Sequence, residues 1–511
     1  MNRLFLAIAL ILAGFTAACS NGGVASAPPP TGKFSTSSLK GAYAFSMSGT
    51  NATTGNPISR IGSFVADGAG GITMAIEDAN SAGNLSPAVS FLTAPASSYT
   101  VQSNGQGTLT LAQSTTGALT FSFSLSSTSF GYIIQTDGSS SSSGFFQLQT
   151  LSNAFSASYA FDFSGIDVNA STNASIVGQF TTNGTTGITG GLLDINDGTQ
   201  LTSSTAVTAA GIGPDPTFGA TFGRGSFVLD SLVFTYYMID QNNLVVLEAD
   251  SNFATIGSAT AQTNVPTTVA GLAGNFVFIV GGATGGTGPA GPISRAARFT
   301  SDASGNLTNI DLDQNDAGTH LIFPKSTFSN PSITIDPSGT GRGTLQFTDL
   351  SSTAVFSYVF YLSSATSGFI QDISNNDVLD GSISSQAAGP FTLSSLAGNY
   401  VVNWSGFNGN NSFEEDFVGQ FALTSATTSN ITGATDYAEL GSGQVITAAA
   451  MTGNLTITGD GTRGGSKANT AAIQAGNQSF TFNAYVLDNN NIVLLGTDTT
   501  RIVLGTATRQ P

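Results

Sequence analysis

Apolar and small polar residues alternate along most of the chain, with a period of two. Tyr43, Phe45 and Met47 occupy alternate positions in one such run, and residues 121–125 repeat the pattern. This alternation places the large side chains on one face of a β-strand. Turn-forming pairs such as the Asp-Gly at residues 67–68 separate the runs, as hairpins require. No segment shows a convincing helical period, so the sequence predicts an all-β fold.

The first part of the chain shows how one unit of this pattern is organised. About eight strands are expected near residues 42–48, 60–66, 71–78, 98–102, 107–112, 118–126, 130–136 and 144–149. Antiparallel strands joined by short connections suit a small up-and-down barrel, because closure leaves no strand edge free. A β-sandwich of two sheets is the alternative.

The same pattern recurs four times, which establishes internal duplication. An opening strand that begins with Tyr or Phe and reaches Gly six residues later recurs at residues 43–49, 159–165, 276–282 and 400–406. Turn-like Gly-x-Gly elements follow at residues 105–107, 223–225 and 341–343, with Arg463 before a glycine in the fourth copy. Each copy closes on a glycine followed five residues later by a glutamine, at Gln149, Gln262, Gln386 and Gln510.

Composition and charge narrow the class of protein. A chain of 511 residues is too long for one hydrophobic core. Only 8% of the residues are charged, and 36 Phe and 11 Tyr are present, which is unlike a disordered chain. The net charge of −17 is dispersed along the sequence. A nucleic acid partner is excluded, because phosphate binding requires clustered cations.

The beginning of the chain has the form of an export signal. Arg3 precedes an apolar run at residues 4–15, which is too short to span a bilayer, and small residues then lead to Cys19, the only cysteine. This arrangement resembles the lipobox of bacterial lipoproteins, although Thr16 stands where that family prefers leucine. The resemblance implies a diacylglycerol on the Cys19 thiol and acylation of the new amino terminus. With Ser20 next in the chain, it also implies sorting to the outer membrane.

An ordinary signal peptide, cut near Ala18 or within residues 25–27, is the alternative. The expected organisation is a signal peptide at 1–18, a lipid anchor and flexible tether at 19–37, and β modules at 38–150, 151–263, 264–387 and 388–511. Little sequence separates consecutive modules, so we expect a semi-rigid string of beads.

The chain offers few residues for catalysis. His320 is the only histidine, lies in a polar stretch and has no counterpart in the other copies, so we expect a loop residue without a catalytic role. The two glutamates at residues 414–415 are expected in a solvated loop between the first two strands of the fourth copy. Trp404 has the register of Met47 and Phe163, which predicts a place in the core.

Metal ligands are also scarce, and a zinc site would need ligands that the chain lacks. Residues 311–316 resemble the start of an EF-hand calcium loop, and residues 78–80 and 194–197 echo them. Asp316 and Ile322 stand where that loop has glycine and glutamate, so the family match fails. Because Asp and Asn also form turns with their own backbone, plain hairpin ends are favoured over calcium sites.

We therefore expect a non-enzymatic, lipid-anchored protein of the cell envelope that binds or spaces something at the surface. Its partners would be the membrane, through the lipid, and an envelope component, protein or glycan that the sequence does not name. We expect no cofactor and no metal. The first alternative is lipocalin-like binding of a small apolar ligand inside each barrel. A secreted esterase or glycosidase is a more distant one.

Overall fold

The computed structural model describes residues 33–511 apart from 115–116, 286–290, 324–327, 375–376, 410–412, 425–428, 441–442, 458–469 and 477. Cys19, the predicted signal peptide and most of the tether lie outside the described residues, as does Arg463. The regular structure consists almost entirely of strands in four antiparallel sheets, one for each copy of the repeat. The all-β prediction is confirmed.

Each module has one short helical turn, and its other regular elements are strands. The turn precedes the first strand in modules 1, 3 and 4 and lies between strands in module 2. Module 1 contains η1 (Thr36–Ser38), β1 (Lys40–Asn51), β2 (Pro57–Asp67), β3 (Ile72–Ser81), β4 (Asn84–Ser90), β5 (Ser98–Val101), β6 (Gln106–Ala112), β7 (Ala118–Ser127), β8 (Phe130–Gln135) and β9 (Ser140–Leu148). Module 2 contains β10 (Ser158–Asp167), β11 (Thr172–Thr182), β12 (Gly187–Asn196), β13 (Leu201–Val207), β14 (Ala210–Pro214), α1 (Gly219–Phe222), β15 (Arg224–Leu229), β16 (Leu232–Asp240), β17 (Asn243–Glu248) and β18 (Phe253–Ala261).

The second half of the chain repeats this order. Module 3 contains η2 (Val269–Leu272), β19 (Gly274–Thr284), β20 (Pro292–Ser301), β21 (Leu307–Asp316), β22 (Thr319–Phe323), β23 (Phe328–Ile335), β24 (Arg342–Asp349), β25 (Val355–Leu362), β26 (Ser367–Asp372) and β27 (Asp377–Ser385). Module 4 contains α2 (Leu393–Leu396), β28 (Gly398–Asn408), β29 (Phe413–Leu423), β30 (Ser429–Glu439), β31 (Gln444–Thr456), β32 (Thr470–Ala475), β33 (Gln478–Val486), β34 (Asn491–Gly496) and β35 (Arg501–Arg509). No helix in the described ranges has the length and apolar character needed to cross a membrane.

The sheets are barrel-like, as predicted, but only those of modules 2 and 4 close completely, and modules 1 and 3 form half-barrels. Strands β28 to β35 of module 4 form a closed barrel. In module 2, β12 pairs with β11, β13 and β14, which completes a circuit of eight strands. Modules 1 and 3 are nine-stranded sheets whose two ends approach at isolated bridges, Gly71 to Ser98 and Asn306 to Ser332. The strand missed in module 1 is β4, a short edge strand paired with β3.

Aromatic side chains fill the barrels. Tyr43, Phe45 and Met47 are at most 3% exposed and belong to the core of module 1. Trp404 is fully buried in module 4, and its ring lies 4.9 Å from that of Phe417, which confirms its predicted place in the core. Protein side chains therefore fill most of the space that the lipocalin-like alternative needs for a ligand.

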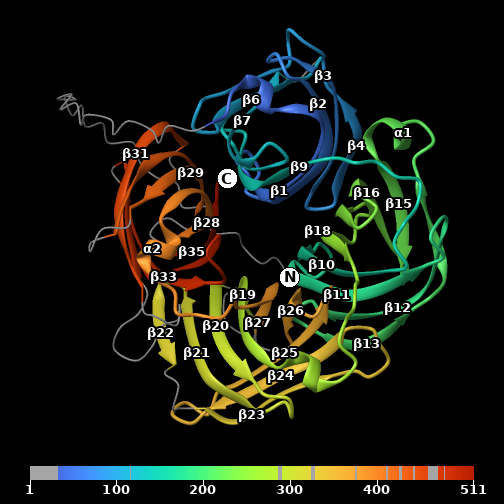
Figure 1. The fold of residues 1–511 in the computed structure, drawn as a ribbon. Coiled ribbons are helices and arrows are strands. Elements are labelled where there is room, and N and C mark those ends of the chain that lie inside the picture. Colours follow the sequence, from blue (N-terminus) through green and yellow to red (C-terminus); the bar gives the residue numbers. More distant parts are fainter. Residues whose placement is uncertain are drawn as a thin grey trace, which may run out of the picture.

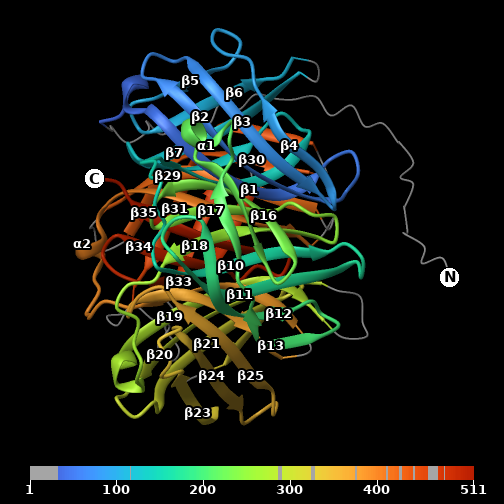
Figure 2. The same ribbon diagram turned by 90° about the vertical axis from the view of Figure 1, so that its right-hand side faces the viewer.

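The four barrels pack into a closed ring, so the expected string of beads is wrong. Figure 1 shows the modules around a common centre, with module 4 in orange and red beside module 1 in blue, and Figure 2 shows the same packing from the side. Strands β28 and β29 of module 4 contact β7, β8 and β9 of module 1, just as β1 and β2 contact β16, β17 and β18 of module 2. The outer faces of these strands are themselves apolar: Ala44, Ile61 and Ile76 pack against Tyr237 and Val245. Burying this second apolar surface favours the ring over separated beads.

Candidate functional site

The Gly-x-Gly elements place an arginine in the junctions between modules. Arg224 begins β15, and its Nε and Nη2 donate to the two carboxylate oxygens of Asp78 in module 1 at 2.8 and 2.7 Å. The Tyr237 hydroxyl donates to the same carboxylate at 2.7 Å. Arg342 repeats this geometry on Asp194 at 2.9 and 2.8 Å. A bidentate pair of this kind is strong and orients its partners. The Gly-Arg-Gly elements, which the sequence predicted as turns, therefore also join neighbouring modules.

The glutamines that close each copy make a second fastening. Gln149 Nε2 donates to the carbonyls of Phe222 and Met238 in module 2 at 2.9 and 2.6 Å. Gln262 reaches module 3 and Gln386 reaches module 4 in the same way. Gln510 then reaches back to module 1, where it donates to the Asn104 and Leu125 carbonyls. The repeat is therefore cyclic, because its last copy binds its first.

Glycine is required where these glutamines arrive. Gly341 has φ +71°, and an added Cβ would lie 2.7 Å from the Leu362 carbonyl oxygen and 2.8 Å from Gln262 Nε2. Gly105 occupies the corresponding place beside Gln510, with φ +93°. A side chain at either position would meet backbone strain, together with a clash at Gly341 and tight contacts of 3.0–3.1 Å at Gly105.

The stretches that echo a calcium loop are used in the same junctions. Asn80 Nδ2 donates to the Glu248 and Phe253 carbonyls of module 2 at 3.0 and 3.2 Å. Asn315 does the same to module 4, at 2.9 Å from the Gly496 carbonyl, and Tyr485 donates to Asp313 at 2.5 Å. The expected hairpin ends are confirmed, since Asn80 and Asn315 accept hydrogen bonds from the backbone of their own turns at 2.8 and 3.1 Å, and the same side chains also bridge modules. Among the described residues no cluster of three or more acidic, histidine or cysteine side chains could hold a metal.

Two further expectations about single residues are corrected. His320 lies on strand β22 and not in a loop, with Nε2 3.5 Å from Asp313 Oδ1 and 3.4 Å from Asn483 Nδ2. Glu414 and Glu415 belong to β29 and not to a solvated loop. Glu415 is fully buried, where Arg501 Nε donates to both its oxygens at 2.9 and 3.1 Å. Burial raises the pKa of Glu415 to about 7, against the lowering effect of Arg501.

The candidate binding site is a cleft of about 530 Å³ at one end of module 3, where the lining includes Phe356 of the barrel core. Its apolar side is formed by Leu321, Ile322, Phe323, Val355 and Phe356. Ile322 and Val355 are 47% and 51% exposed. Strand β22, which supplies the first three of these side chains, is an edge strand of its sheet. A free edge beside exposed apolar side chains can accept an added strand from a partner.

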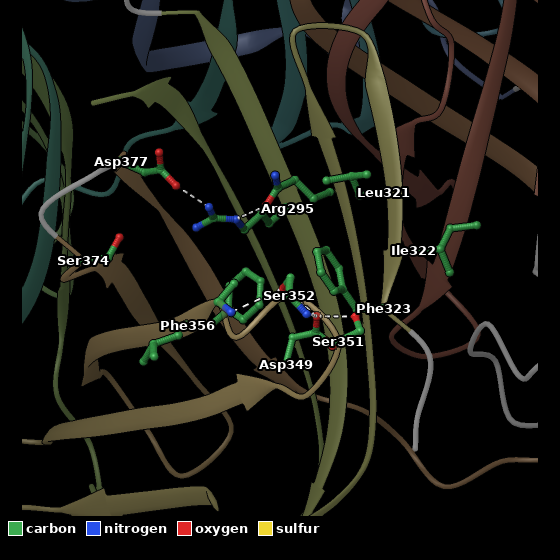
Figure 3. A pocket seen from close by; sticks show the side chains of 13 residues that line it. Arg295, Leu321, Ile322, Phe323, Asp349, Ser351, Ser352, Phe356, Ser374 and Asp377 are labelled. Carbon is green, nitrogen blue, oxygen red and sulfur yellow. Dashed lines mark hydrogen bonds and ion pairs between the residues drawn. The ribbon is translucent and has the colours of Figure 1, made fainter. Parts of the chain in front are cut away.

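The floor of this cleft is polar and ordered around Arg295. Figure 3 shows the guanidinium of Arg295 turned toward Asp377, above the ring of Phe356. Nε donates to Gln314 at 2.7 Å, Nη1 donates to Asp372 at 2.5 Å and Nη2 donates to Asp377. The guanidinium carbon lies 5.3 Å from the centre of the Phe356 ring. Because two carboxyl groups already bind this guanidinium, the floor does not offer a free cation to an anionic ligand.

The loop between β24 and β25 adds a further carboxylate to the lining. Asp349 accepts hydrogen bonds at 2.6 Å from the hydroxyls of Ser351 and Ser352. Burial raises the pKa of Asp349, but these hydroxyls outweigh it and lower the pKa to about 2. The cleft therefore has an acidic balance at neutral pH. Ile176 and Phe417 stand in modules 2 and 4 where module 3 has Arg295, so the floor is not shared by all copies.

Comparison with known proteins assigns no family. No family model matches the chain, and no curated protein matches it. Among solved structures it is similar to isotype 1 transferrin binding protein B from serogroup B Neisseria meningitidis, with 11% identity, TM-score 0.20 and coverage of 72% of this chain and 79% of the other. A double mutant of transferrin binding protein B from Haemophilus parasuis matches with 8% identity, TM-score 0.16 and coverage of 93% and 96%. CghA matches with 10% identity, TM-score 0.15 and coverage of 82% and 88%. At these scores the likeness carries no argument about function.

Sequence reasoning did not find the cleft. It noticed His320 and residues 311–316 on the neighbouring strands, but the cleft also needs β20 and the loop after β24, which come from elsewhere in the module. The one available signal was the run Leu321-Ile322-Phe323, which breaks the alternation of apolar and polar residues.

Proposed function

We propose that this chain is a non-enzymatic, lipid-anchored binding protein of the cell envelope. The four barrels act as a rigid ring, and the cleft on module 3 binds an extended segment of a partner protein. The observation that carries the proposal is that β22 is an edge strand of its sheet and also supplies exposed apolar side chains to the cleft. The filled barrel interiors support a role at the surface over a role in carrying small molecules.

The chemistry of the cleft favours one kind of segment. The edge of β22 offers backbone groups, the apolar wall suits alternate apolar side chains, and the carboxyl groups of Asp349, Asp372 and Asp377 outnumber the one guanidinium. An extended peptide that alternates apolar and basic residues satisfies all three features.

A fluorescein-labelled peptide that alternates valine with lysine tests this proposal by fluorescence anisotropy on the full chain in detergent. We expect binding to the wild type and at least about tenfold weaker binding to Ile322→Lys, because the new charge blocks the apolar wall. Leu92→Lys in module 1 is the matched control, since Leu92 is 45% exposed and lies outside the cleft. Equal binding of a valine–glutamate peptide, or equal loss in the control, would count against the proposal.

The anchor is tested separately. We expect Cys19→Ala to abolish incorporation of radiolabelled palmitate and to release the protein from the membrane fraction, because the thiol is the expected site of acylation and stable anchoring needs more than one acyl chain. Cys19→Ser provides a second variant with a similar side-chain volume. Label retained by either variant contradicts the lipobox assignment, and it leaves the cleft proposal unaffected.

A further inference from the structure

Only one of the four junctions in the ring lacks a covalent link between its two modules. The polypeptide itself joins modules 1 to 2, 2 to 3 and 3 to 4, whereas module 4 meets module 1 through non-covalent contacts alone. Opening the ring with every barrel intact must therefore happen between modules 4 and 1.

This ring-closing junction lacks the bidentate arginine pair that joins modules 1 and 2 and modules 2 and 3. Asp436 has the register of Asp78 and Asp194, but the positions of arginine and tyrosine in module 1 are held by Gln106 and Ser124. Gln106 Nε2 donates to the Ala434 carbonyl at 3.3 Å and forms no charged pair. Among the residues that the structure describes, no Arg or Lys forms an ion pair across this junction.

The junction has gained a pair of acidic side chains instead. Asp416 is fully buried, and its Oδ2 accepts a hydrogen bond from the Ser141 hydroxyl of module 1 at 2.6 Å. Its Oδ1 is buried without a hydrogen-bond partner. Glu414 lies two residues away on the same strand and therefore on the same face. A serine occupies the register of Asp416 in each other module: Ser59, Ser175 and Ser294.

The surroundings of this pair contain acids and neutral groups. Thr50 from β1 faces Glu414, and Ser141 from β9 faces Asp416. On the neighbouring strands of module 4, Ser405 and Ala438 are the register partners of Asp416. The charged or titratable neighbours are Glu415, which binds Arg501 inside the barrel, Asp436 and Glu439 on β30, and Tyr132 and Asp137 of module 1.

Asp416 is buried and Glu414 is partly buried, and carboxylates in such a place without a cation are unfavourable. The closed junction therefore favours their protonated forms. Burial raises the pKa of Asp416 to about 7. Burial, and after it the neighbouring Asp416, raises the pKa of Glu414 well above its usual range. In an open ring both groups meet water and return to ordinary carboxyl values near about 4.

We propose that the junction between modules 4 and 1 is a proton-operated latch, closed while Asp416 and Glu414 are protonated and opened when both ionise. The closed ring binds more protons than the open one at pH values above the ordinary carboxyl pKa. Closure is therefore fully favoured in acid and is lost as the pH rises from about 4 through about 7. The junction between modules 2 and 3 also buries two carboxyl groups, Asp162 and Asp380, but there the chain links the two modules.

Distances between spin labels test this latch in the full chain, with Cys19→Ser so that only introduced thiols react. Thr128→Cys and Asn490→Cys place one label on module 1 and one on module 4, at exposed turns on either side of the junction. Thr366→Cys with Asn490→Cys reports the linked junction between modules 3 and 4 as a control.

Electron–electron double resonance should give one short distance for the first pair at about pH 5 and longer, broader distances at about pH 9. The ratio of closed to open ring should fall at least about tenfold between these conditions. The control pair should not change. Asp416→Ser, which restores the residue found in the other modules, and Glu414→Gln with Asp416→Asn should both keep the short distance at the higher pH. An unchanged distance in the parent chain overturns the proposal, as does equal opening in these variants or loss of the β-sheet circular dichroism signal on opening.

Discussion

Replacing Trp404 with alanine is expected to lower the unfolding free energy of module 4 by about 3–5 kcal/mol, the range for removing a large aromatic side chain from a packed core. Trp404 is fully buried among aromatic rings. Its ring centre lies 4.9 Å from that of Phe417, 5.4 Å from that of Phe480 and 5.3 Å from that of Phe482. Its removal leaves a cavity at the centre of the barrel, and closed strands cannot collapse into it without breaking their pairing. Urea unfolding followed by circular dichroism measures the loss.

The repeat supplies the control for this variant. Phe163 occupies the same register in module 2, so Trp404→Phe should retain most of the stability. A loss below about 1 kcal/mol for the alanine variant would show that the core of module 4 tolerates a cavity, contrary to its packing.

Replacing Arg342 with methionine is expected to cost about 3–5 kcal/mol, because removing one partner of a buried ion pair leaves the other charge uncompensated. Asp194 is fully buried, and after the change only the Tyr361 hydroxyl, at 2.6 Å, would still donate to its side chain from module 3. The side chain of Arg342 is 18% exposed, so water weakens the pair only slightly. Thermal unfolding of the variant, compared with the wild type at the same pH, measures the effect.

The matched variant is Arg224→Met, which removes the same bidentate pair from the junction between modules 1 and 2. The loss at this junction should be at least as large, because the bidentate geometry repeats and Arg224 also donates to Asp215. Adding Asp194→Asn to Arg342→Met should restore part of the stability, since the neutral amide is less costly to bury. If the double variant is as unstable as the single one, loss of packing by the arginine side chain explains the effect and the charge does not.

The strands of the modules could be predicted because their cause is local. Alternation in runs such as residues 43–47 puts aromatic side chains on one face, and the same residues fill the barrel. Glycine in the second strand has an equally local role: a Cβ on Gly62 would lie 2.5 Å from Phe45 Cζ, so the aromatic ring of one strand needs a glycine on the next. Strand β4 was missed because Pro87 and the exposed residues around it carry no alternating pattern.

The candidate site was less accessible to prediction. Glu414 was placed in a loop because two adjacent glutamates near a turn normally remain in water. Its partial burial depends on Thr50 of module 1, which lies far away in the sequence. The terminal glutamines and the Gly-Arg-Gly elements were recognised as markers of the repeat. Their hydrogen bonds could not be inferred, because each joins residues from two different copies.

By itself the sequence determined the all-β class, the four copies, their register and the aromatic core of each barrel. These follow from side-chain period and duplication, which need no knowledge of distant contacts. The tertiary structure alone decided that the copies form a ring, that Gln510 returns to module 1, and that Asp416 is buried without a cation. Those features arise where the outer faces of separate barrels meet. The sequence of one outer face does not indicate which other surface will pack against it.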